Sequence, residues 1–78
     1  MSRKEGGVKM DKVEANLTAL AKARADFFVN RYALNAEDEA EVREDFRFVA
    51  WLWAGEYRDG KCSEAKAMNI VGKLEPVL

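Results

Sequence analysis

Few residues of this chain have the types and spacing that a chemical reaction requires. The 78 residues include no histidine and a single cysteine, Cys62. The sequence places Cys62 just before a third helix, whose dipole can lower a thiol pKa, but the chain offers neither a histidine base nor a second thiol. A zinc site would lack its usual ligands, and no Gly-rich segment forms a phosphate cradle. We therefore expect no enzymatic activity, with no catalytic residue, metal, cofactor or small-molecule substrate.

A run of carboxylates is the most prominent charged feature. It comprises Glu37, Asp38, Glu39, Glu41, Glu44 and Asp45. At helical spacing these side chains spread over an exposed surface, where Glu37, Asp38 and Glu41 can form a secondary contact for a basic partner. More often such a run is a solvated helix start, favoured by the helix dipole. Arg43 and Arg47 interrupt the run, which argues against mimicry of nucleic-acid phosphates.

The charges as a whole are balanced but unevenly placed. Thirteen Lys and Arg oppose fourteen Asp and Glu, a net charge of −1, and a general nucleic-acid binder normally shows a clear basic excess. Residues 1–34 carry +3, residues 35–57 carry −5 and residues 58–78 carry +1. The simplest interpretation of this asymmetry is that it steers two helices together.

The apolar feature that organises the chain is the segment 46–57, which holds both tryptophans, two of the four phenylalanines and one of the two tyrosines. Helical spacing divides its neighbourhood into two stripes. One stripe consists of Val42, Phe46, Val49, Ala50, Trp53 and Tyr57. The other, on the opposite side, consists of Phe48, Trp51 and Leu52. A helix that is apolar on two faces is expected to be sandwiched between partners.

The pattern predicts three helices, at about 8–33, 36–57 and 64–75, in a single helical domain of residues 8–78 that follows a flexible arm of residues 1–7. The first is Ala-rich and free of internal Gly and Pro. Asn35 and Ser63 are suitable N-caps for the second and third. Asp59-Gly60 marks the turn between them, and Pro76 shows that the third helix has ended.

These elements predict an all-α fold, a long antiparallel helical hairpin with a short third helix. The rings of the second helix should pack onto the alanines of the first, with Phe28 near Val42 and Phe46. The third helix should return to cover part of the second stripe. Because a domain this small buries little surface and Cys62 has no disulfide partner, oligomerisation is the remaining source of extra stability. A homodimer is therefore an open alternative to one core shared by three helices.

For function, the sequence favours a small cytoplasmic protein that binds and modulates another protein, or itself as a homodimer. The expected interface is Phe27, Phe48, Trp51 and Leu52, because the third helix carries too few large side chains to cover them. A reducing cytoplasm fits a single thiol and an N-terminal region without an apolar leader. The longest apolar run, 48–54, has seven residues, too few to span a membrane.

The alternative is a small helix-turn-helix-like DNA-binding regulator, since a short Gly-containing turn joins the second and third helices. The residues for this interpretation are Arg58, Lys61, Lys66, Asn69 and Lys73. Lys66 and Asn69 would read bases, and the other cations would contact phosphates. The nearly neutral net charge and the long first helix argue against it.

Overall fold

The computed structural model describes residues 12–77 and contains three α-helices and no strand within that range. The helices are α1 (Lys12–Tyr32), α2 (Ala36–Arg58) and α3 (Glu64–Val71). The all-α prediction is confirmed. The predicted arm, residues 1–7, and the predicted first turn of the first helix, residues 8–11, lie outside the described residues.

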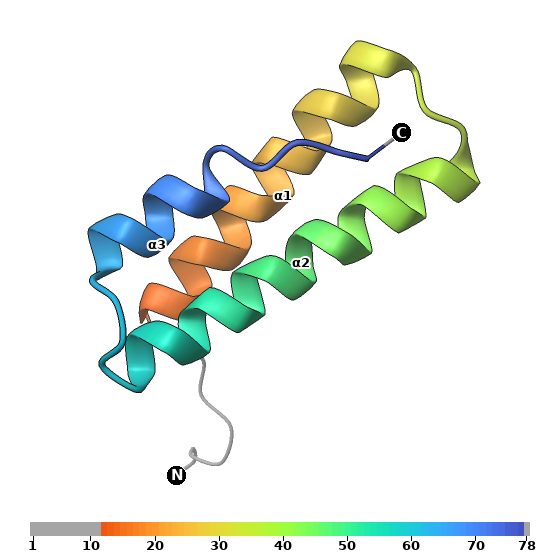
Figure 1. The fold of residues 1–78 in the computed structure, drawn as a ribbon. Helices are drawn as coiled ribbons and strands as arrows, with labels where there is room; N and C mark the ends of the chain where they lie inside the picture. The colour runs from red at the N-terminus through yellow and green to blue at the C-terminus, as the bar shows by residue number, and fades with distance from the viewer. Residues whose placement is uncertain (1–11, 78) are drawn as a thin grey trace, which may run out of the picture.

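The polypeptide turns sharply after α1, and α2 returns beside it, while α3 and the segment that follows it lie over one side of the pair (Figure 1). Contacts are most extensive between α1 and α2, and α3 touches both. Ala33 adopts a left-handed conformation, with φ 50°, and the Leu34 N–H donates to the Val29 carbonyl at 3.2 Å. These two features end α1.

Local capping sets where α2 and α3 begin. The Asn35 side chain accepts a hydrogen bond from the Asp38 N–H at 2.8 Å, and Ser63 Oγ accepts one from the Lys66 N–H at 3.1 Å. Each bond satisfies one of the amides that a helix start leaves without an intrahelical partner. Both predicted N-caps are confirmed.

The core is built largely from small side chains. The buried apolar residues are Val13, Leu17, Ala21, Ala25, Phe28, Val42, Phe46, Ala50, Ala54, Ala67 and Val71. The expected proximity of Phe28 and Phe46 is confirmed, since their rings meet edge to face with centroids 6.2 Å apart. The expectation that all the rings of the first stripe pack onto alanines is only partly met, because Trp53 and Tyr57 stay half-buried at the edge of the core. Ala50 and Ala54 take the deepest positions of α2 instead.

The third helix is shorter than predicted, and it packs in the common core instead of over the second stripe of α2. It ends at Val71 rather than near residue 75, with Gly72 as its C-cap. Its buried residues, Ala67 and Val71, join the core shared with α1 and α2, so the expectation that it covers part of the second stripe is wrong. Phe48 and Leu52 lie about 160° around α2 from the buried Ala50, and a helix that enters the common core cannot also reach that outer side.

The segment after α3 is tied to α1. Arg24 Nε donates a hydrogen bond to the Leu74 carbonyl at 2.9 Å, and the same guanidinium lies 4.9 Å from the centroid of the Phe28 ring. This arrangement combines a charge-assisted hydrogen bond with a cation–π contact. The final residues therefore extend the cover over α1.

Candidate interaction surface

The outer side of α2 presents three large apolar side chains to solvent. Phe48 is 57 % exposed, Trp51 58 % and Leu52 43 %. We call these three residues the aromatic patch. Their spacing, i, i+3 and i+4, puts them side by side on one helix face, and the Phe48 and Trp51 rings lie 5.9 Å apart at a tilt of 33°. The patch is thus a preassembled apolar surface on a rigid element.

Charged residues adjoin the aromatic patch on its N-terminal side. Glu44 and Arg47 line a shallow depression together with Phe48 and Trp51. Sequence reasoning did not assign Glu44 or Arg47 to the interface. The signal that identifies Glu44 is its spacing, four residues before Phe48 on the same helix face.

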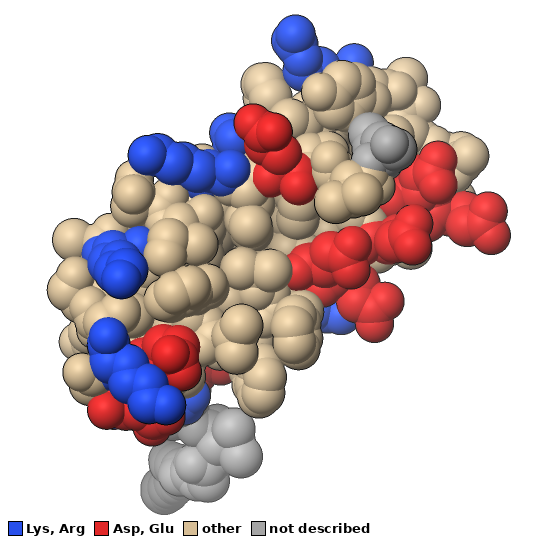
Figure 2. Space-filling model, viewed as in Figure 1, with Lys and Arg blue, Asp and Glu red and all other residues tan. Residues whose placement is uncertain are grey.

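The secondary acidic residues come together in the structure. Glu37, Asp38 and Glu41 line a second depression that also includes Glu44. Figure 2 shows acidic side chains gathered over the first half of α2. Because Glu44 belongs to both depressions, the acidic residues and the aromatic patch form one continuous surface along α2.

Phe27, the fourth predicted interface residue, lies on α1. It is 51 % exposed, and its ring packs against Phe28 with centroids 5.1 Å apart at 79°. Within the described part of the chain it has no ring contact with Phe48 or Trp51. The structure therefore brings three of the four predicted aromatic-surface residues together and leaves Phe27 apart.

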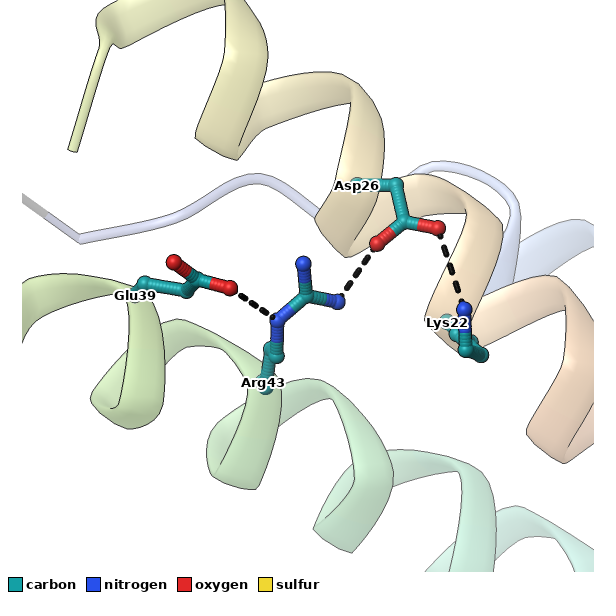
Figure 3. A network of polar contacts seen from close by, with 4 residues as sticks. All are labelled: Lys22, Asp26, Glu39 and Arg43. Carbon is teal, nitrogen blue, oxygen red and sulfur yellow. Dashed lines mark hydrogen bonds and ion pairs between the residues drawn. The ribbon is translucent and has the colours of Figure 1, made fainter. Parts of the chain in front are cut away.

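A polar network beside this surface joins α1 to α2 (Figure 3). Arg43 donates to Asp26 through Nη1 and to Glu39 Oε2 through Nε at 2.8 Å, and Lys22 Nζ lies 3.3 Å from Asp26 Oδ2. The hydrogen bonds from Arg43 and then from Lys22 hold the pKa of the Asp26 carboxyl below its ordinary value of 3.8. The hydrogen bonds to Asp26 and then to Glu39 raise the pKa of Arg43. This network ties α2 to α1 and pairs Glu39 with a residue of the same chain.

The five residues of the DNA-binding alternative are all exposed: Arg58, Lys61, Lys66, Asn69 and Lys73. Lys61 Nζ lies 3.9 Å from Glu56 Oε2. The charged residues of α3 are Glu64 and Lys66, so this short helix has no net positive charge to offer a phosphate backbone.

Three other features considered from the sequence are the Cys62 thiol, metal binding and membrane insertion. Cys62 is a free, half-buried thiol packed against the core. Across residues 12–77, no three carboxylate or thiol side chains come close enough to hold a metal ion. Over the same range, no helix is long and apolar enough to cross a membrane.

Comparisons with protein-family models, with curated proteins and with solved structures gave no match. The geometry of the α2 surface is therefore the basis for a functional proposal.

Proposed function

We propose that this protein is a small cytoplasmic interaction protein that binds another protein chain through the outer side of α2 and modulates it, without catalysing a reaction. The observation that carries the proposal is the aromatic patch, three large apolar side chains exposed together on a helix whose own core is complete without them. Monomeric proteins tolerate single exposed apolar residues, whereas a contiguous group of them marks an interaction site.

The patch retains substantial free energy for binding. A buried aromatic side chain removes about 150–250 Å² from water, and more than half of Phe48 and of Trp51 is exposed. Covering the remaining area of either ring is worth about 2–3 kcal/mol at 25 cal/mol per Å². Tryptophan in particular is enriched among the residues that dominate binding energy.

The scaffold suits a helix-mediated mode of binding. We take α1 and α2 as an antiparallel hairpin that α3 and the polar network hold in place. The outer side of α2 then presents anchors at positions 48, 51 and 52, the spacing by which helices dock on apolar partner surfaces. The acidic residues Glu37, Asp38 and Glu41 lie beside them, where their field would accelerate association with a basic partner.

Affinity capture with matched variants tests this function. The wild-type chain, Trp51→Ala and Phe27→Ala would each be immobilised and exposed to an extract of the source cells, after circular dichroism has shown that all three are folded. We expect Trp51→Ala to lose the bound proteins, and Phe27→Ala, which removes an equally exposed ring from α1, to retain them. Retention of every bound protein by folded Trp51→Ala would refute the proposal.

The DNA-binding alternative is favoured only by the exposure of its five residues. Its recognition helix would be α3, which has eight residues and no net charge, whereas affinity for duplex DNA arises largely from neutralised phosphates. We expect no mobility shift with random duplex DNA at low salt. A shift that disappears with added salt and is lost in Lys66→Ala would favour this alternative over the proposed function.

A further inference from the structure

A straight line of residues, here called the outer seam, follows the outer side of α2. Residues spaced alternately by four and three occupy one line along the helix, namely Glu37, Glu41, Glu44, Phe48, Trp51, Gly55 and Arg58. Helices that stay in contact over several turns meet along a line of this spacing, and Phe48 and Trp51 are its large apolar members here. None of the seven residues is buried in the described structure, whereas the opposite seam of α2 packs in the core through Val42, Phe46, Ala50 and Ala54.

Gly55 is independent support that something packs on this seam. Glycine weakens a helix relative to alanine, so its presence inside α2 calls for a reason. A methyl group added at Gly55 would meet only the Arg58 guanidinium, at 3.9 Å, so packing within the chain does not require glycine there. A neighbouring helix packed on the outer seam would require a small residue there, because the missing side chain allows the two helices to approach closely.

The order of charges along the seam favours a second copy of the same chain in the opposite direction. The seam is acidic at its N-terminal end, at Glu37, Glu41 and Glu44, and ends in Arg58. Parallel pairing would set Glu41 against Glu41 and Arg58 against Arg58. In antiparallel pairing about a two-fold axis between Phe48 and Trp51, Glu41 of each copy lies opposite Arg58 of the other.

The same register matches the sizes of the other side chains. Phe48 of each copy packs against Trp51 of the other at the centre, and Glu44 lies opposite Gly55, beside the Arg58 guanidinium. Each of these residue pairs occurs twice, because a two-fold axis relates the two copies. Leu52, beside Trp51, widens the apolar centre.

We propose that the outer side of α2 binds the same surface of a second copy of this chain, with the two α2 helices antiparallel and Phe48 packed against Trp51 across the axis. This inference rests on the proposed function, because it names the occupant of that surface. The exposed part of the aromatic patch is roughly 300 Å², less than the ~800 Å² that each partner buries in a standard interface. The contact must therefore use the seam from Glu37 to Arg58, about 32 Å of helix, and we expect a dimer of micromolar affinity.

Exchanging the charges of Glu41 and Arg58 tests both the identity of the chain bound to α2 and the relative direction of the two helices. Sedimentation velocity from about 1 to 300 μM should show a concentration-dependent dimer for the wild type. We expect Trp51→Ala to raise the dimer Kd by about 30-fold or more, and Glu41→Arg or Arg58→Glu alone to raise it about 3- to 10-fold. The double variant Glu41→Arg with Arg58→Glu should recover wild-type association.

Recovery in the double variant is specific to the antiparallel pairing. Residues 41 and 58 are 17 positions apart on one helix, about 25 Å, so they cannot pair within a chain, and parallel copies would repel in every variant. Phe27→Ala is the control for loss of an exposed ring and should leave the dimer Kd unchanged.

Several results would overturn the inference and can be told apart from failure of the proposed function. A wild-type chain that stays monomeric to 300 μM excludes the second copy, and loss of captured proteins by Trp51→Ala would then still support the proposed function with a different occupant. A dimer that Phe27→Ala disrupts and Trp51→Ala does not would refute both the surface and the register. A dimer without recovery in the charge exchange would refute the antiparallel arrangement.

Discussion

Two phenylalanines, two positions apart on α2, should respond very differently to truncation. Phe46 is 3 % exposed and meets Phe28 edge to face, whereas Phe48 is 57 % exposed on the aromatic patch. Truncation of a buried phenylalanine to alanine typically costs 3–5 kcal/mol, from the lost transfer free energy and the cavity that remains. We expect Phe46→Ala to lose about 3–4 kcal/mol, including about 1 kcal/mol from the ring pair.

For Phe48→Ala we expect a loss of less than about 0.5 kcal/mol in the monomer, the usual range for surface changes. A 78-residue domain has roughly 4–12 kcal/mol of total stability. Phe46→Ala should therefore retain only about 0–9 kcal/mol of this stability, while Phe48→Ala retains nearly all of it.

Urea denaturation followed by circular dichroism measures both free energies of unfolding. The experiment is done at about 1 μM protein, so that self-association adds little to the stability of the wild type. Phe46→Leu serves as an intermediate control, because it retains most of the volume and loses mainly the ring pair. We expect its loss to lie near 1–1.5 kcal/mol.

Equal losses for Phe46→Ala and Phe48→Ala at this concentration would refute the assignment of the two faces of α2. A large loss for Phe48→Ala would mean that another part of the same chain covers the aromatic patch, and the patch would then be unable to serve as an interaction surface.

Three further predictions concern single contacts. The stability that Asp26 gains from Arg43 is present above the ordinary carboxyl pKa of 3.8 and is lost as the pH falls through the lowered folded value; Asp26→Asn should thus be less stable than the wild type at pH 7, and the difference in urea midpoint should shrink as the pH falls below 3.8. Ala33, at φ 50°, is strained, so Ala33→Gly should raise the free energy of unfolding by about 0.5–1 kcal/mol, and a loss instead would refute the left-handed turn. Asn35→Ala should cost about 1 kcal/mol through the lost bond to the Asp38 N–H, while Asn35→Ser should restore most of it.

The starts of the helices were predictable because their causes are local. Asn35 and Ser63 bond to amides three residues ahead, so a short stretch of sequence contains both partners. The end of α3 was not predictable in this way. Beyond Val71 the chain leaves the helix and its Leu74 carbonyl accepts from Arg24, a residue 50 positions earlier, and no local pattern reveals that contact.

The two apolar stripes of α2 were predictable from their spacing, and Val42, Phe46 and Ala50 do lie in the core. The extent to which each ring is buried could not be predicted from the spacing. Trp53 stays half-buried because the central positions of the helix contacts are filled by alanines. Whether α3 covers Phe48 depends on where α3 docks, and that choice is decided by Ala67 and Val71 fitting the common core.

The small-residue core and the exposed aromatic patch have one cause, which is the placement of small and large side chains around α2. Ala21, Ala25, Ala50 and Ala54 lie in one buried cluster, and small side chains allow helices to approach closely but bury little apolar area per residue. Apart from the buried Phe46, the largest apolar residues of α2 are then left at the edge of the core or outside it. Covering the outer seam with another chain would bury more of this apolar surface. If that chain is a second copy, stability must rise with protein concentration, because a partner that binds only the folded form shifts the folding equilibrium. The wild-type urea midpoint should then increase between 1 and 300 μM, and the midpoint of Trp51→Ala should increase much less.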